Sequence, residues 1–148
     1  MSKSDLEFDC KPTLPINKDI GIGIIGAGAI VQVAHLPAYK KAGFNVAGIY
    51  DLDANRASNT AASFGIGRVY SDLEHLLADP RVSIVDIATP PSGRKQMVEA
   101  VVKSGKHILC QKPISDVYSD AVSTRPGYAC EVCCRWSWAE SQLRTPLH

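Results

Sequence analysis

The sequence predicts an α/β fold built on a doubly wound parallel sheet, because short apolar strands alternate with helical segments along most of its length. The apolar runs are Ile20–Ile25, Phe44–Tyr50, Val82–Ala88 and Lys106–Cys110, the last expected as the fifth strand. Runs with few polar residues are typical of parallel strands covered on both faces. Right-handed crossovers then give the strand order 3-2-1-4-5, with a ligand crevice where the order reverses between strands one and four.

The first two helices have clear signals in the sequence. The first should extend over Ala29–Ala42, and Pro37 lies inside it. Because an interior proline costs about 3 kcal/mol, we expect a break or kink near Leu36. The second helix is the alanine-rich segment Ala54–Phe64, for which Asp53 is the expected N-cap.

Two further helices follow. Ser71–Glu74 reads Ser-Asp-Leu-Glu, the pattern of a capping box, and should start a short helix that extends through Leu77. After it, Asp79 and Arg81 flank a turn and are expected to be solvated charges. Ser92–Ser104 places apolar residues along one helical stripe and is stopped by a glycine.

Composition excludes several classes of protein. The chain has 148 residues, about one domain, with 45% hydrophobic residues and a net charge of +1, so nothing favours nucleic acid or an anionic membrane as a partner. No run approaches the roughly 18 apolar residues of a membrane span, and the N-terminal segment has no apolar core like that of a signal peptide. We therefore expect a cytoplasmic protein. Its five cysteines, an odd count, argue against a disulfide framework.

The most informative segment is Ile20–Val31, where an apolar strand runs into a glycine turn and then a helix. Gly26 must turn the backbone sharply, and Gly28 has no side chain, so a phosphate can approach the main chain there. Ala29 and Ile30 begin a helix whose free amide groups and positive dipole end point at that phosphate. This order of elements predicts a dinucleotide site, in a sheet of the Rossmann type.

A carboxylate lies at the appropriate distance after the glycine turn. Asp51 follows the second apolar run, near the spacing of about 20 residues expected when a carboxylate accepts from the adenosine ribose hydroxyls. A carboxylate at this position favours NAD, because it would repel a 2′-phosphate. Arg56 lies nearby, so NADP stays open as the cofactor.

The residues that follow the strands resemble the Gfo/Idh/MocA family of oxidoreductases (glucose–fructose oxidoreductase, inositol dehydrogenase, rhizopine catabolism protein). The resemblance covers Ile20–Pro113, and Gln-Lys-Pro directly after the last strand is its most specific motif. The other matching features are the glycine turn, Ala-His-Leu-Pro at Ala34–Pro37, Asp51, Ala-Thr-Pro-Pro at Ala88–Pro91, and the stretch Gly105–Pro113 that ends in Gln-Lys-Pro.

This resemblance implies a role for each matching residue. Gly26 and Gly28 would contact the pyrophosphate, Asp51 the adenosine ribose, and Thr89 and Pro90 the pyrophosphate and the nicotinamide ribose. The motif of Gln111, Lys112 and Pro113 would face the nicotinamide end of the cofactor. There Gln111 stands where the family more often has Glu, and Lys112 would be the catalytic residue, donating to a substrate oxygen and stabilising developing negative charge.

Other histidine and arginine positions are less informative. Family members often carry His at the start of the helix after Thr-Pro, where this chain has Arg94. Arg94 would meet a phosphate or face water, and the residues leave this open. His35 and His107 are expected to have structural roles, at the start of a helix and in a strand.

The resemblance ends soon after Pro113. We therefore expect a flexible segment at residues 1–19, a Rossmann dinucleotide-binding domain at 20–118, and an unrelated or disordered tail at 119–148 of the kind left by a shifted reading frame or a joined exon. We also expect the family's C-terminal α/β domain, which by this resemblance would shape the substrate pocket, to be lacking. Its absence would expose apolar surface on the late half of the sheet and favour oligomerisation.

Two functional hypotheses follow. The first is an oxidoreductase that transfers a hydride between NAD(P) and a sugar, polyol or related hydroxyl compound. The alternative is a non-catalytic dinucleotide-binding fragment, or a truncated product without independent activity, because an enzyme must position its substrate as well as its cofactor.

The tail also contains candidate metal ligands. Cys130, Cys133, Cys134 and His148 could supply four zinc ligands, but the second well-spaced pair of a structural zinc site is missing. We expect incidental thiols and no metal.

Overall fold

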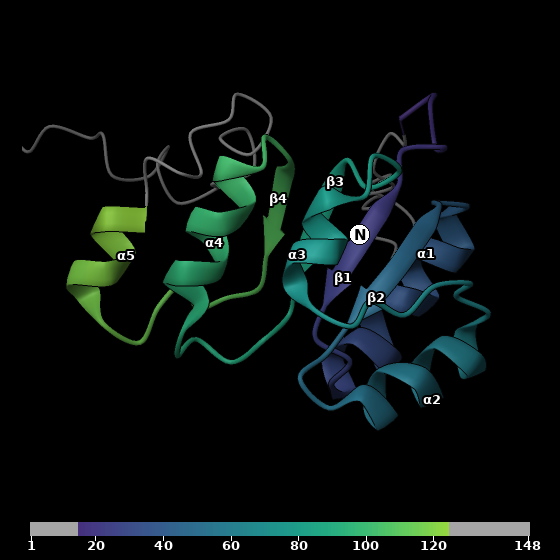
Figure 1. Ribbon diagram of the computed structural model, residues 1–148, viewed down its shortest axis with the longest axis horizontal. Helices are drawn as coiled ribbons and strands as arrows, with labels where there is room; N and C mark the ends of the chain where they lie inside the picture. Colours follow the sequence, from purple (N-terminus) through teal and green to yellow (C-terminus); the bar gives the residue numbers. More distant parts are fainter. Residues whose placement is uncertain (1–14, 125–148) are drawn as a thin grey trace, which may run out of the picture.

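The computed structural model describes residues 15–124, which form a four-stranded parallel sheet with helices on both sides (Figure 1). The strands are β1 (Ile22–Ile25), β2 (Val46–Tyr50), β3 (Ile84–Ile87) and β4 (His107–Cys110). Their spatial order is β2-β1-β3-β4, and every neighbouring pair is parallel. The predicted fold class is confirmed, with shorter strands than the apolar runs suggested.

Within the described residues, the third of the five predicted strands is reduced to a single bridge. Outside β2, where a third strand was expected, the chain makes a single parallel bridge between Ile49 and Val69. Two backbone hydrogen bonds hold it, from Ile49 N to Arg68 O at 3.0 Å and from Tyr70 N to Ile49 O at 2.9 Å. The turn that starts at Ser71 ends the pairing there. The expected fifth strand is therefore the fourth, β4.

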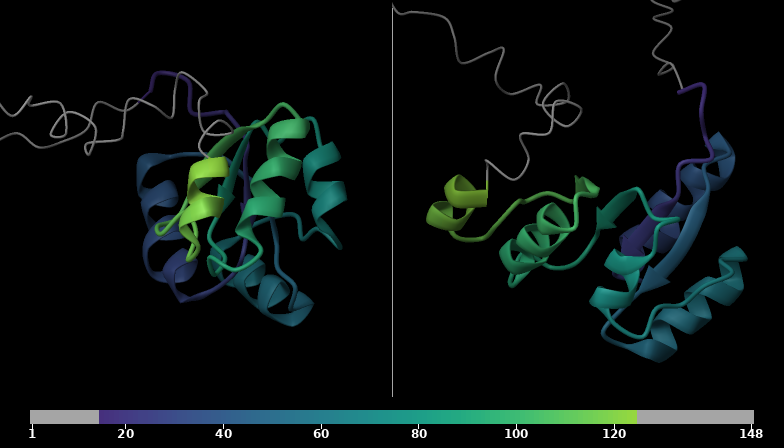
Figure 2. Two further views of the ribbon diagram at one scale, coloured as in Figure 1. Left: turned by 90° about the vertical axis from the view of Figure 1, so that its left-hand side faces the viewer. Right: turned by 45° about the horizontal axis from the view of Figure 1, so that its top comes forward.

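Side chains alternate between the two faces of the sheet, as a pleated strand requires. In β1, Ile22 and Ile24 pack on one side with Val31, Leu36 and Ile49, while Ile25 packs on the other. The first side is covered by the turn η1 (Val31–His35), α1 (Leu36–Ala42) and α2 (Ala54–Phe64). The second side is covered by α3 (Leu73–Ala78) and α4 (Arg94–Lys103). The left view of Figure 2 shows helices on both sides of the sheet.

The predicted irregularity in the first helix is present. Residues Val31–His35 form one π-helical turn, and a regular α-helix starts at Leu36. Pro37 lies in the first turn of that α-helix, where a missing N–H costs little. The wider turn thus lets the chain continue without the clash that an interior proline would cause.

The second helix has the predicted bounds, and the third has a different cap. The Asp53 side chain accepts hydrogen bonds from Asn55 N and Arg56 N at the start of α2. At α3, however, the N-cap is Asp72, which accepts from His75 N at 2.8 Å. Ser71 lies one residue outside and donates to the Asp72 carboxylate, so the predicted capping box is wrong. Aspartate is as good an N-cap as serine, so it takes the position.

Asp79 is buried rather than solvated, which corrects a second expectation. Its carboxylate accepts from Tyr70 Oη at 2.8 Å and from Arg81 Nη2 at 2.7 Å, and Arg68 Nη1 lies 3.4 Å away. The Arg81 side chain and backbone hold the pKa of Asp79 well below its usual range. Lys106 Nζ also donates to Asp79 O at 2.9 Å. This carboxylate joins segments that flank α3.

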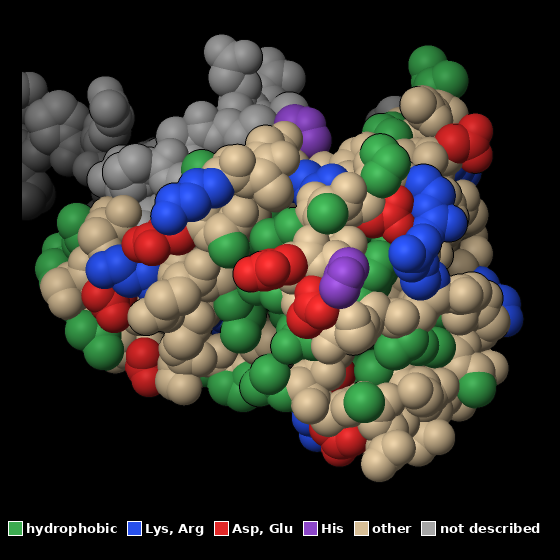
Figure 3. Space-filling view, in the orientation of Figure 1, with side chains coloured by type: hydrophobic (Ala, Val, Ile, Leu, Met, Phe, Trp, Pro, Cys, Tyr) green, Lys and Arg blue, Asp and Glu red, His purple; other side chains and the backbone are tan. Residues whose placement is uncertain are grey.

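The end of the sheet beyond β4 exposes apolar side chains. Helix α5 (Tyr118–Thr124) lies against α4. Val117, just before it, and Tyr118 and Val122 within it are between 49% and 85% exposed. Figure 3 shows hydrophobic side chains at the left edge of the molecule, where α5 lies. Exposed apolar side chains are thus present on and beside α5, while apolar surface left bare on the sheet, and the association that it would favour, remain predictions. In residues 15–124 no helix is both long and apolar enough to cross a bilayer; the cytoplasmic location also stays a prediction.

Candidate nucleotide-binding site

The predicted site residues meet at one edge of the sheet. Because all four strands are parallel, the residues after β1, β2, β3 and β4 lie together where the strands end, toward the bottom of Figure 1. Backbone hydrogen bonds continue past the strands and tie these segments together: Gly26 N to Tyr50 O at 2.7 Å, Ala88 N to Ile25 O at 2.9 Å, and Gln111 N to Ile87 O at 3.0 Å. The strand order reverses between β1 and β3, the position where such sheets bind ligands.

The two glycines of the turn have different environments. Gly26 has a φ of +102°, and an added Cβ would lie 2.9 Å from Ala88 O, so both conformation and space require glycine. At Gly28 an added Cβ would meet nothing within 4 Å, and its φ is not positive. Gly28 therefore borders open space, as a site for an approaching phosphate must. Ala29 and Ile30 are exposed beside it, at the start of the helix.

Asp51 lies at this edge with its carboxylate surrounded by donors. It accepts from Ala27 N at 2.7 Å, from Asp53 N at 2.8 Å, and from Arg56 Nε and Nη2 at 3.2 and 2.7 Å. Burial raises the pKa of Asp51, but the Arg56 and backbone donors outweigh it, so the net pKa is lowered. The Asp51 side chain is 7% exposed and the Arg56 side chain 49%. A ribose hydroxyl would have to replace a contact to Arg56, the exposed partner of the pair.

Arg94 neither meets a phosphate nor faces water. It is 2% exposed, and its guanidinium donates to three backbone carbonyl oxygens, those of Thr89, Gln111 and Pro113. These carbonyls belong to the two segments that follow β3 and β4. Arg94 therefore fixes the Thr-Pro segment against the Gln-Lys-Pro segment. Sequence reasoning missed this role, and the only signal was an arginine where the family often has histidine.

The remaining motif residues border the crevice. Thr89 is half-buried and its hydroxyl lies 3.6 Å from Met97 Sδ, while Pro90 is exposed. Lys112 is exposed and precedes Pro113 through a cis peptide bond. Gln111, in contrast, is half-buried and points its amide inward. The structure thus gives the lysine freedom to reach a ligand, while the glutamine is held.

A buried polar cluster lies directly beneath this edge. Asp86 in β3 is fully buried, and its Oδ2 lies 2.7 Å from His35 Nδ1 and 2.8 Å from Tyr39 Oη. His35 Nε2 lies 2.6 Å from Gln111 Nε2. Burial, together with the Asp86 charge, raises the pKa of Tyr39, so its hydroxyl stays a donor. The structural role expected for His35 is present, but the link to Gln111 was not predicted, because the two residues come from distant segments.

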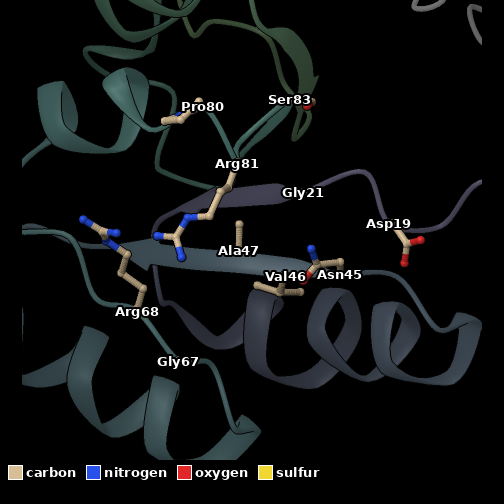
Figure 4. A pocket seen from close by; sticks show the side chains of 10 residues that line it. All are labelled: Asp19, Gly21, Asn45, Val46, Ala47, Gly67, Arg68, Pro80, Arg81 and Ser83. Carbon is tan, nitrogen blue, oxygen red and sulfur yellow. The ribbon is translucent and has the colours of Figure 1, made fainter.

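A hollow on the described part of the chain lies at the opposite edge of the sheet. It has a volume of about 790 Å³ and is open to solvent at the amino-terminal ends of the strands. Figure 4 shows Arg68 and Arg81 reaching over it from the segments on either side of α3. Both arginines pair with Asp79, so they hold the fold together at this edge.

Metal ligands are not gathered in the described region. Among residues 15–124 no group of three His, Cys, Asp or Glu side chains is placed to hold a metal ion. The cysteines and the histidine of the candidate zinc motif lie outside the described residues.

The comparisons with known proteins agree with this geometry. The model of the Gfo/Idh/MocA oxidoreductase family, with an NAD-binding Rossmann fold, matches residues 20–124. The chain is 31% identical over 99 residues to 1,5-anhydro-D-fructose reductase of Ensifer adhaerens, covering 67% of this chain and 30% of the relative. It is 32% identical over 100 residues to inositol 2-dehydrogenase of Acidothermus cellulolyticus, covering 67% and 29%. A solved oxidoreductase from Thermotoga maritima superposes with a TM-score of 0.71 at 27% identity, covering 74% of this chain and 35% of that one.

The fold is the Rossmann fold that is described for the NAD-binding part of this family. The chain belongs to the Gfo/Idh/MocA oxidoreductase family. The match reaches residue 124, which includes α5. The chain spans less than a third of the length of the curated relatives it matches, and the matched part is their NAD-binding portion.

Proposed function

We propose that this chain binds a nicotinamide dinucleotide in the crevice at the carboxyl ends of β1 and β3, as the cofactor-binding part of an oxidoreductase. The observation that supports this most directly is the open space at Gly28 beside the exposed start of a helix. Amide groups there can donate to a pyrophosphate while the helix dipole favours its charge. In this proposal Gly26, Gly28, Ala29 and Ile30 form the pyrophosphate site.

The other contacts follow from the order of the strands. Asp51, after β2, would receive the adenosine ribose, with the exposed Arg56 side chain moving aside. Thr89 and Pro90, after β3, would border the pyrophosphate and the nicotinamide ribose. We infer a preference for NAD over NADP, because the buried Asp51 carboxylate would repel a 2′-phosphate.

The nicotinamide end would lie against the segment after β4. Bound there, the cofactor would accept or give up a hydride at its nicotinamide ring. Gln111 and Pro113 would border it, and Lys112 would donate to the substrate oxygen, where its charge stabilises developing negative charge. The relatives named for an anhydro sugar and for inositol support a sugar or polyol as the substrate.

The experiment that tests this proposal is a titration of the purified chain with NADH, followed by cofactor fluorescence. Saturable binding that competes with NAD supports it, and the absence of saturable binding contradicts it. Turnover of NAD with a panel of polyols then separates the two hypotheses. Turnover that Lys112→Ala abolishes supports an enzyme, whereas binding without any turnover supports a dinucleotide-binding fragment.

A further inference from the structure

The cluster beneath the site contains a chain of hydrogen bonds whose direction can be worked out. Asp86 Oδ2 is an acceptor for two neighbours, and Tyr39 Oη can only donate to it. His35 Nδ1 lies 2.7 Å from the same oxygen, so it must carry a proton to bond with it. The carboxylate therefore fixes the Nδ1–H form of the imidazole.

The other ring nitrogen then determines how Gln111 is oriented. A neutral imidazole protonated at Nδ1 has a lone pair at Nε2 and can accept one hydrogen bond there. The side-chain nitrogen of Gln111 lies 2.6 Å from Nε2 and is a donor. The amide nitrogen is thus held inward. The Gln111 backbone is held as well, because Arg94 donates to its carbonyl oxygen.

We propose that His35 is a positioning residue, which holds the Gln111 amide so that its carbonyl oxygen is offered to a hydroxyl group of the ligand in the crevice. This inference rests on the proposed function, which places Gln111 beside the nicotinamide ribose. A carbonyl oxygen accepts, and a ribose hydroxyl can donate to it. Asp86, Tyr39 and Gln111 are the groups that face His35, from β3, α1 and the segment after β4.

The burial of the cluster explains why this orientation is stable. The His35 side chain is 13% exposed and Asp86 is fully buried, so water does not compete strongly for their hydrogen bonds. The second carboxylate oxygen, Asp86 Oδ1, is buried with no hydrogen-bond partner. An unpaired buried acceptor is costly. The two contacts at Asp86 Oδ2, to His35 and Tyr39, are therefore the hydrogen bonds that offset the burial of this carboxylate.

The first test determines the protonation state of His35 in the full 148-residue chain. Nitrogen-15 NMR of the imidazole groups distinguishes the two neutral forms and the doubly protonated ring, and the spectrum of His35→Asn assigns the His35 signals. We expect the Nδ1–H form at neutral pH. Protonation at Nε2, in either the other neutral form or the doubly protonated ring, would overturn the proposal.

The second test measures NADH affinity. His35→Asn keeps a donor toward Asp86 but has no Nε2 acceptor, so we expect about three- to tenfold weaker NADH binding with little change in thermal unfolding. His75→Asn is the matched control, because His75 Nδ1 also pairs with an aspartate, Asp72, at 2.5 Å, but its side chain is exposed on the outer side of α3. Unchanged NADH affinity in His35→Asn would overturn the proposal.

The third variant replaces the hydrogen-bond donor at residue 111 with a group that can only accept. In Gln111→Glu a carboxylate replaces the amide and can only accept, so His35 must bind a second proton to keep the contact. We expect the doubly protonated ring to persist to higher pH than in the wild type. An unchanged His35 spectrum would contradict the assignment. If His35 has the expected form but the wild type does not bind NADH, the assignment is supported and the proposed function is the part that fails.

Discussion

Replacing Gly26 or Gly28 by alanine should have different effects: one substitution should weaken folding and the other should weaken cofactor binding. At Gly28 the added methyl group would meet nothing within 4 Å and the backbone has no positive φ, so the fold accepts it. Replacing glycine by alanine at such a position stabilises a protein by about 0.4–1 kcal/mol, through the unfolded chain. The methyl group would nevertheless occupy the space in which we place the pyrophosphate. Losing one hydrogen bond to a charged group costs about 1.5–3 kcal/mol, so NADH should bind about 10- to 150-fold more weakly.

Gly26→Ala is the matched comparison and should have the opposite profile. Its φ of +102° strains any other residue by about 1–3 kcal/mol, and its Cβ would lie 2.9 Å from Ala88 O. Urea unfolding followed by circular dichroism gives the stability, and fluorescence titration gives the NADH affinity. If Gly28→Ala binds NADH as tightly as the wild type, the reasoning that places the pyrophosphate at Gly28 is refuted. If Gly28→Ala unfolds as readily as Gly26→Ala, the conformational argument is wrong.

Three further predictions test contacts that support the fold and the site. Arg94→Met leaves three carbonyl oxygens without their donor, so the free energy of unfolding should fall by about 1–3 kcal/mol in urea titrations and NADH affinity should fall with it. Asp79 has a lowered pKa in the folded state, so its stabilising contribution is complete above about pH 4 and is lost as the pH falls further; Asp79→Asn should flatten this acid dependence of the melting temperature. Asp51→Ser frees Arg56 from its ion pair, so the ratio of NADPH to NADH affinity should rise at least about tenfold, and an unchanged ratio would contradict the role given to Asp51.

Most of the fold could be predicted because its signals are local. The glycine turn, the proline in the first helix and the Asp53 cap each act within a few residues, and the structure has all three. The strand order followed from the handedness of crossovers, which does not depend on side chains. The missing strand beside β2 shows the limit: its place was predicted from topology, yet the chain there pairs through Val69 alone.

The supports of the site could not be predicted, because they are long-range contacts of polar side chains. The burial of Asp79, at the opposite edge of the sheet, was also missed: its partners Arg81, Tyr70 and Arg68 are close in sequence, but they surround its carboxylate only when the segments on either side of α3 have folded. His35 and Gln111, in contrast, lie on segments far apart in the sequence. Chemistry can assign the direction of such a hydrogen bond only after the fold has brought the atoms together.

The two positions at which this chain departs from the family pattern, Arg94 and Gln111, are in direct contact. The family resemblance implies histidine and glutamate at two positions where this chain has Arg94 and Gln111, and the arginine donates to the glutamine's backbone carbonyl. With the histidine neutral, the usual pair would have a charge of −1, and the pair in this chain has a charge of +1. This edge of the sheet, where we place the nicotinamide end of the cofactor, would therefore be more positive by two charges. A buried guanidinium is screened little by salt. In the proposed function, this exchange would strengthen the attraction for an anionic cofactor, and His35 would supply the orientation of Gln111 that a carboxylate at that position would not need.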